Sequence, residues 1–170
     1  MPEMKSLVRM TVVAAITLAS TLAHGQRPLI DGLDRPAAKP AAVVFLYPEQ
    51  IAIPADKPTT VTLHFRVAPG LHINSHMPTA DELIPTTFTI PEDSGVQLIS
   101  AIYPRGVEFA LPLDPTTKLS VNTGECSLQA RIKATPGNHL VEARLHYQAC
   151  DNNVCMPPKT IPVVIDVTGK

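Results

Sequence analysis

The sequence has no tryptophan and only three cysteines, and its aromatic residues are limited to three tyrosines and four phenylalanines. It therefore lacks the Cys…Trp…Cys spacing that marks true immunoglobulin domains. An excess of charge of one sign is also lacking, because 14 Lys and Arg face 15 Asp and Glu, for a net charge of −1. Neutralising phosphates requires clustered basic side chains, so this balance gives no reason to expect a nucleic-acid partner.

Several catalytic and nucleotide-binding motifs are missing as well. The chain contains no Gly-x-Ser-x-Gly, no phosphate-binding loop and no HExxH, so hydrolase and nucleotide-binding functions have no support. Proline, in contrast, is abundant at 18 residues, roughly double its average usage. Because proline costs about 3 kcal/mol inside a helix, a helical bundle is excluded. A compact hydrophobic core is not excluded, since 45% of the residues are hydrophobic.

Residues 1–25 predict a cleavable signal peptide. Lys5 and Arg9 precede an apolar run over 10–22, which is shorter than the roughly 20 residues of a membrane-spanning helix. Ala23-His24-Gly25 then places small residues at the two positions that a signal peptidase reads. We therefore expect a periplasmic or secreted protein with no membrane span in the mature chain.

The remaining chain is predicted to form a leader and one domain. Residues 26–41 contain three prolines and little apolar periodicity, which is typical of a flexible leader. From 42 to 170, short segments rich in alternating or β-branched residues recur at a spacing of roughly 8–12 residues. The predicted strands are Ala42–Tyr47, Thr59–Val67, Thr86–Ile90, Val96–Tyr103, Lys118–Val121, Ser127–Ala134, His139–Tyr147 and Thr160–Val167. This pattern predicts an all-β sandwich with immunoglobulin-like topology.

Cys150 and Cys155 are separated only by Asp151-Asn152-Asn153-Val154, a run of turn-forming residues. In an oxidising compartment two thiols this close normally pair. Chain entropy gives such a short loop about 2.2 kcal/mol of stabilisation, against about 3 kcal/mol for a fifteen-residue loop. It is therefore a poor place for a stapling bridge, yet short structural disulfides are common. Spacing alone leaves a structural disulfide and a redox-active pair equally open.

The remaining candidate ligands and thiols have weaker support. His146 could join the cysteines in a zinc site, and Met77 or Met156 could join them in a copper site, but no complete ligand set is apparent. Cys126 shares a predicted strand face with apolar residues, which favours a small buried hydrophobic residue. His72 and His76 have no carboxylate pattern near them, so we expect loop or surface histidines.

The segment Leu145–Val167, LHYQACDNNVCMPPKTIPVVIDV, resembles the end of the N-terminal periplasmic domain of the thiol:disulfide interchange protein DsbD. The shared features are Tyr147-Gln148 before the first cysteine, the short polar loop, the second cysteine, and Pro157-Pro158 before a final strand. The stretch Leu119–Leu128 is also similar to the preceding strand pair of the family. Weaker similarity begins near Val43, so the resemblance covers most of the expected mature chain.

The resemblance implies an immunoglobulin-like domain that shuttles reducing equivalents outside the cytoplasm, with no cofactor. Cys150 and Cys155 would be the exchanging pair, Cys155 forming the mixed disulfide with partners and Cys150 resolving it. A thioredoxin-like domain or a membrane electron transporter would be the donor, and an oxidised periplasmic protein the acceptor. The aromatic cap loop of the family corresponds to Tyr103–Leu113, with Phe109 and Tyr103 as shielding rings.

The sequence also departs from the family pattern. The loop between the cysteines is shorter than in the best-known member, and Met156 stands where an aromatic residue is familiar. The membrane domain and the thioredoxin-like domain have no counterpart, so we expect the electron donor to be another protein. The alternative hypothesis is a non-catalytic binding or adaptor sandwich in the cell envelope, with a purely structural disulfide.

Overall fold

The computed structural model describes residues 40–46, 50–112 and 114–170. The predicted signal peptide (1–25), most of the predicted leader (26–41), Tyr47 and Leu113 lie outside the described residues. Within the described ranges every regular element is a strand, and none is a helix long and apolar enough to cross a membrane.

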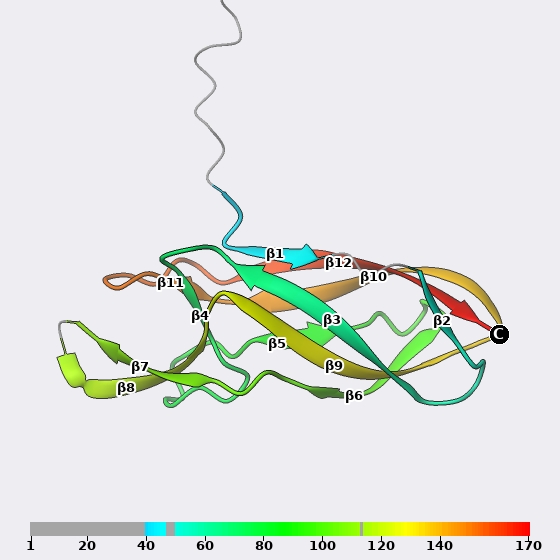
Figure 1. Cartoon of the computed structure of the whole chain (residues 1–170), viewed down its shortest axis with the longest axis horizontal. Coiled ribbons are helices and arrows are strands. Elements are labelled where there is room, and N and C mark those ends of the chain that lie inside the picture. Colours follow the sequence, from blue (N-terminus) through cyan, green and yellow to red (C-terminus); the bar gives the residue numbers. More distant parts are fainter. Residues whose placement is uncertain (1–39, 47–49, 113) are drawn as a thin grey trace, which may run out of the picture. The chain divides into compact units, whose positions relative to one another are not determined.

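Two four-stranded sheets form the body of the domain (Figure 1). The first has the order β1-β3-β9-β6, with β1 at Val43–Leu46, β3 at Thr59–Val67, β9 at Glu125–Ala134 and β6 at Val96–Ile102. The second has the order β2-β12-β10-β5, with β2 at Ile51–Ile53, β12 at Lys159–Gly169, β10 at Gly137–Tyr147 and β5 at Thr87–Thr89. All pairs are antiparallel except β2 with β12, which is parallel.

The core lies between these sheets because their long strands alternate apolar and polar residues. Successive side chains of a strand point to opposite faces, so every second residue of β3 and of β10 turns inward. Leu63 on β3, Ile132 on β9 and Val141 on β10 are each 0% exposed. Buried aliphatic and aromatic side chains from both sheets belong to one continuous cluster.

The strand order confirms the predicted immunoglobulin-like sandwich. Lettered in the immunoglobulin manner, β1, β3, β5, β6, β9, β10 and β12 are strands A to G. The first sheet then has the order A-B-E-D, and the second contains C, F and G as neighbours, with β2 added beside G. The all-β class therefore follows from the strands themselves, and the topology follows from their order.

A third sheet is formed by segments that connect the strands of the first two sheets. It has the order β11-β4-β8-β7, with β11 at Ala149–Cys150, β4 at His72–Asn74, β8 at Asp114–Asn122 and β7 at Val107–Leu111. Its strands come from the B–C, D–E and F–G connections. Figure 1 shows β7, β8 and β11 gathered at the end of the domain opposite the C-terminus. This sheet contains Cys150.

Every predicted strand range overlaps an observed strand, and Thr59–Val67 matches β3 at both ends. Four observed strands of five residues or fewer have no counterpart among the predicted ranges, namely β2, β4, β7 and β11. Three of these four belong to the third sheet. The stretch expected to form the cap loop contains β7, paired with β8 in an antiparallel hairpin.

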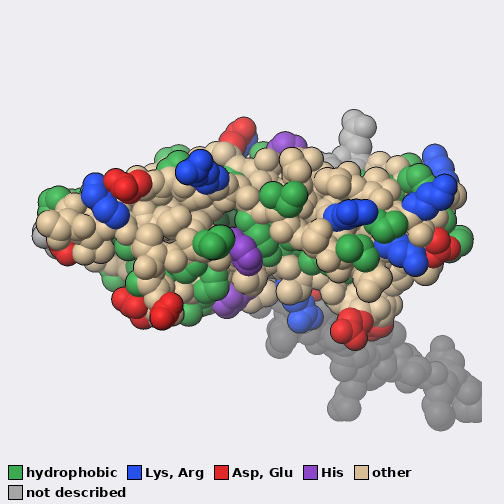
Figure 2. Space-filling model, turned by 90° about the horizontal axis from the view of Figure 1, so that it is seen from below, with side chains coloured by type: hydrophobic (Ala, Val, Ile, Leu, Met, Phe, Trp, Pro, Cys, Tyr) green, Lys and Arg blue, Asp and Glu red, His purple; other side chains and the backbone are tan. Residues whose placement is uncertain are grey.

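Charged side chains of both signs are interspersed over the face seen in Figure 2, with no large area of one sign. Among the described residues, ion pairs connect Arg66 with Glu125, Lys118 with Glu108, and Lys133 with Asp56, at 2.7, 3.0 and 3.8 Å. All six side chains are at least 40% exposed, so these pairs contribute little to stability.

Candidate functional site

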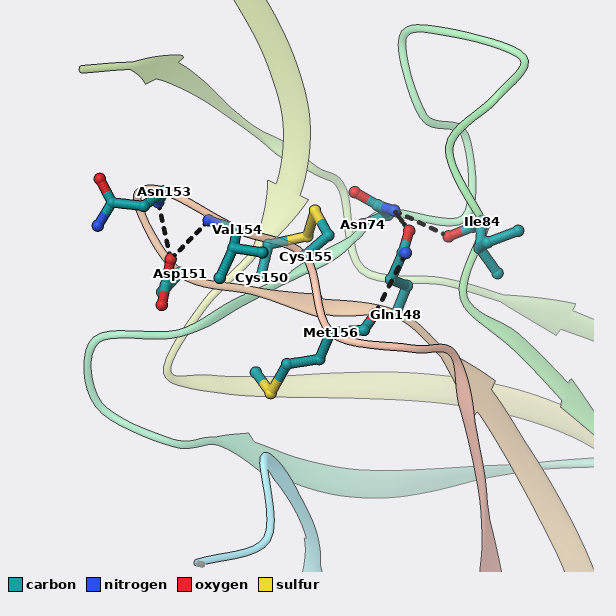
Figure 3. Close-up of a disulfide and its surroundings, with 9 residues drawn as sticks. All are labelled: Asn74, Ile84, Gln148, Cys150, Asp151, Asn153, Val154, Cys155 and Met156. Atoms are coloured by element: carbon teal, nitrogen blue, oxygen red, sulfur yellow. Dashed lines mark hydrogen bonds between the residues drawn. A yellow bond between two sulfur atoms is a disulfide. The ribbon is translucent and has the colours of Figure 1, made fainter. Parts of the chain in front are cut away.

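Cys150 and Cys155 form a disulfide, which confirms the expected pairing (Figure 3). The two sulfurs are 2.03 Å apart and the two Cα atoms 4.0 Å apart, and the residues form an isolated antiparallel bridge. The two cysteines differ in their access to solvent. Cys150 lies on β11 and is 2% exposed, whereas Cys155 is exposed. A molecule approaching from solvent therefore meets Cys155 first.

The loop between the cysteines is closed by Asp151. One carboxylate oxygen, Oδ1, accepts hydrogen bonds from the backbone N–H groups of Asn153 and Val154 at 2.7 and 2.8 Å. The backbone N–H of Asp151 donates to the carbonyl of Val154 at 3.0 Å. This is the local side-chain-to-backbone bonding that makes Asp a turn former. The predicted tight turn is confirmed, and it brings the chain back beside Cys150.

Gln148 ties the base of the loop to the neighbouring strand. Its Nε2 donates to the carbonyl of Met156 at 3.2 Å, and its Oε1 accepts from Nδ2 of Asn74 on β4 at 3.3 Å. The same Asn74 nitrogen donates to the carbonyl of Ile84 at 3.1 Å. Figure 3 shows these contacts beside the disulfide. A glutamine directly before the cysteine loop thus connects both ends of that loop to β4.

Tyr147 anchors the strand that leads into the loop. Its side chain is 1% exposed and belongs to the core between the two large sheets. Its hydroxyl is hydrogen-bonded to the backbone of Val43 on β1. Burial raises the pKa of the Tyr147 hydroxyl, and the bond to Val43 acts in the opposite direction. Tyr147 and Gln148 therefore have separate tasks, the first in the core and the second at the loop.

The sequence predicted a loop or surface position for His72, and this prediction is wrong. It lies on β4, is 2% exposed, and is paired across the ladder with Cys150. Its ring centroid is 4.4 Å from that of Phe109 on β7. Burial lowers the pKa of His72, although the nearby charge of Asp151 opposes this shift. The sequence signal that could have revealed it is its place in Leu-His-Ile-Asn, a short apolar stretch after a turn.

A groove of about 390 Å³ lies along the disulfide. Both cysteines and His72 line it, together with Leu83 after β4 and Leu119 on β8. Val154, at the tip of the cysteine loop, also lines it and is 61% exposed. The exposed cysteine of the bridge thus lies at an open groove that apolar and polar side chains line together.

The two residues predicted as shielding rings lie in different surroundings. Phe109 is half-buried on β7 and rests against His72, the cross-strand neighbour of Cys150. Tyr103 instead accepts a hydrogen bond from the backbone N–H of Phe88 at 2.8 Å and stacks on His76 at 3.7 Å between ring centroids. Neither Phe109 nor Tyr103 is among the described residues that line the groove. In the described part of the chain Phe109 is connected with the disulfide only through His72, whereas Tyr103 packs on His76.

His76, in contrast to His72, is exposed, as predicted. Cys126 on β9 packs against the core opposite Phe65, but it is half-buried and not buried as expected. Burial raises the pKa of its thiol, which lowers its reactivity at neutral pH. His146 contacts Oγ1 of Thr160 at 3.0 Å. Across the described part of the chain, no three His, Cys, Asp or Glu side chains are grouped closely enough to hold a metal ion.

Comparison with known proteins provides a family match. The family model described as "Thiol:disulfide interchange protein DsbD, N-terminal" matches residues 42–165. The matched range begins just before β1 and ends inside β12, so it includes both paired cysteines and strands of all three sheets. A search of curated proteins found no match.

Two solved structures show a distant likeness. The N-terminal domain of Neisseria meningitidis DsbD, in the reduced form, is 19% identical with a TM-score of 0.46, over 68% of this chain and 82% of that one. The N-terminal periplasmic domain of ScsB from Proteus mirabilis is 12% identical with a TM-score of 0.47, over 73% of this chain and 44% of that one. Family membership therefore rests on the match over residues 42–165.

Proposed function

The chain belongs to the family of N-terminal domains of the thiol:disulfide interchange protein DsbD, and from this premise we propose that it relays electrons through Cys150 and Cys155. The family is one of thiol–disulfide interchange modules. The proposal adds that this chain takes electrons from one partner and passes them to another, and that it does so as a protein-disulfide reductase component.

One observation carries the proposal, namely the unequal exposure of the two bonded cysteines. Cys155 is open to solvent at the edge of the groove, while Cys150 is 2% exposed behind it. Exchange requires a thiolate to reach one sulfur of the bridge and to leave the other as the departing thiolate. The exposure of Cys155 supports it as the sulfur that bonds to partners, and the burial of Cys150 supports it as the resolving sulfur.

The proposed reaction runs in two halves, each moving two electrons. A thiolate of the reduced donor attacks Sγ of Cys155, and the bond to Cys150 breaks with its electron pair remaining on Cys150. The second thiolate of the donor then attacks the donor sulfur that is bonded to Cys155 and displaces Cys155, so the donor leaves as a disulfide. In the second half Cys155 attacks the disulfide of the acceptor, and Cys150 attacks Cys155 to release the reduced acceptor and restore the bridge.

We propose a thioredoxin-like domain or a membrane electron transporter as the donor, an oxidised periplasmic protein as the acceptor, and the periplasm as the location. The groove with its exposed Val154 supports docking of a protein rather than of a small molecule alone. Pro157 and Pro158 are exposed directly after the loop. Because proline has no backbone N–H, the chain at positions 157 and 158 cannot donate to a neighbouring strand, although Met156 before them donates to the carbonyl of Ala149.

The reduction potential of the Cys150–Cys155 bridge tests the proposal against a purely structural disulfide. We expect a value above about −300 mV, because structural disulfides of secreted proteins lie below that level. Equilibration with dithiothreitol buffers of known potential, followed by alkylation and mass analysis, measures it. A value below about −300 mV would favour the alternative, a non-catalytic envelope adaptor.

Phe109→Ala tests the proposed shield. We expect the reduced Cys150–Cys155 pair to be alkylated by iodoacetamide several-fold faster, because the ring that packs against His72 is removed. Tyr103→Ala reports separately on the second proposed shield, and Ile102→Ala, which changes a 65% exposed side chain on β6, is the control. An unchanged rate in Phe109→Ala would remove this residue from the mechanism.

A further inference from the structure

We propose that His72 donates a hydrogen bond from Nε2 to the sulfur of Cys150 when the bridge opens, and so stabilises the departing thiolate. The inference rests on the proposed exchange function and adds a residue to it. It derives from three observations: the register that pairs His72 with Cys150, the burial of an unpartnered imidazole nitrogen, and the packing of the ring against Phe109.

The register brings the two side chains together. His72 on β4 and Cys150 on β11 are direct partners in an antiparallel ladder. Residues directly opposite each other in such a ladder project to the same face, with Cβ atoms roughly 4.5–5.5 Å apart. Both residues also line the groove. The imidazole is therefore the side chain that a freed Cys150 sulfur meets across the strand pair.

The imidazole nitrogen Nε2 has no partner in the disulfide form. It is buried, and no hydrogen bond to it is made in the described part of the chain. Buried polar atoms without a partner are uncommon, and each calls for a physical explanation. In the oxidised protein the Cys150 sulfur is bonded to Cys155 and carries no charge. A thiolate on Cys150 would supply the acceptor that Nε2 lacks.

The packing keeps the imidazole in place and neutral. Phe109 lies against the ring at 4.4 Å between centroids, and His72 is 2% exposed. Burial lowers the pKa of His72, so the ring is uncharged at neutral pH despite the nearby Asp151. In the tautomer with its proton on Nε2, a neutral imidazole donates to sulfur without giving up that proton.

Reduction of the bridge with the help of His72 proceeds by two successive displacements at sulfur. A dithiol reductant, as its monothiolate, attacks Sγ of Cys155 and forms a new sulfur–sulfur bond. The Cys150–Cys155 bond breaks, and its electron pair stays on Sγ of Cys150, where Nε2–H of His72 donates a hydrogen bond. The second thiol of the reductant then loses its proton to water, attacks the reductant sulfur bonded to Cys155 and displaces Cys155, which takes up a proton from water, while Cys150 remains the thiolate. The reductant is oxidised by two electrons, and both cysteines finish reduced.

Two substitutions at position 72 separate the hydrogen bond from the packing. His72→Phe keeps an aromatic ring beside Phe109 but removes Nε2, whereas His72→Gln loses the ring and keeps an N–H donor at a similar reach. His64→Phe makes the same change on the exposed face of β3 and is the matched control. The readout is the second-order rate of bridge reduction by dithiothreitol, with the free energy of unfolding measured for each variant.

We expect His72→Phe to be reduced about tenfold more slowly than the unaltered protein, which equals about 1.4 kcal/mol at the transition state. His72→Gln should recover most of the rate, and His64→Phe should match the unaltered protein. Equal rates in all variants would overturn the proposal. Slow reduction of His72→Gln together with a normal rate for His72→Phe would also overturn it, because a packing role alone predicts that result. Equal slowing of both variants, in proportion to their loss in free energy of unfolding, would overturn it for the same reason.

A measurement on the unaltered protein keeps the test decisive if a variant does not fold. NMR of the imidazole nitrogens, compared between the disulfide and dithiol forms, should show a hydrogen-bond shift at Nε2 of His72 and none at His64. No change at His72 on reduction would overturn the proposal. Dithiothreitol replaces the protein donor in these measurements. Their results would therefore test the role of His72 even if the chain did not relay electrons between partner proteins.

Discussion

Cys150→Ser is expected to accumulate mixed disulfides through Cys155, whereas the unaltered protein forms none that persist. Exposed Cys155 keeps its ability to attack an oxidised partner, but the buried sulfur that would release that partner is gone. Exchange then stops at the first covalent intermediate. The measurement is non-reducing electrophoresis of the reduced variant after incubation with a periplasmic extract, followed by mass analysis of the adducts.

Two companion variants make the trapping result specific. Cys155→Ser removes the exposed sulfur and should form no adducts, since Cys150 is 2% exposed. Cys126→Ser alters the half-buried thiol outside the bridge and should behave like the unaltered protein. Trapping by Cys155→Ser in place of Cys150→Ser would reverse the proposed roles, and absence of trapping in both would remove the relay mechanism.

Tyr147→Ala is expected to lower the free energy of unfolding by about 3–5 kcal/mol, the usual loss when a buried aromatic side chain is cut to alanine. Tyr147 is 1% exposed at the end of β10, where the core meets the cysteine loop. Denaturation of the oxidised protein in urea measures the loss. A decrease below about 1 kcal/mol would mean that this ring does not hold the two sheets together.

Tyr147→Phe is the matched control for that experiment. It keeps the ring in the core and removes only the hydroxyl that is bonded to the backbone of Val43. Losing one hydrogen bond of this kind costs about 1 kcal/mol. The difference between the two variants therefore measures the contribution of the ring apart from that of its hydroxyl.

The sandwich could be predicted because its long strands carry their own signal. β3 alternates buried and exposed residues over its whole length, and β10 does the same over its second half. Such alternation places a face in the core regardless of which strand lies beside it. The turn at Asp151 was also predictable, since its bonds run only to Asn153 and Val154, two and three residues away.

The third sheet could not be predicted in the same way. β4 has three residues and all are buried, so it shows no alternation at all. β11 has two residues, too few for any period. Such strands exist because their backbone groups find partners in segments far along the chain, as Asn74 does with Val121. Their formation is a property of the ladder and not of either segment alone.

The sequence by itself determined the sandwich, the cysteine pair and the turn that joins them, since these depend on residue type and on spacing along the chain. Only the tertiary structure decided that Cys155 is exposed and Cys150 buried, and that Phe109 packs against His72 while Tyr103 packs against His76. It also decided that His72 faces Cys150. The two lie 78 positions apart by their numbers, and only the register of β4 with β11 makes them neighbours.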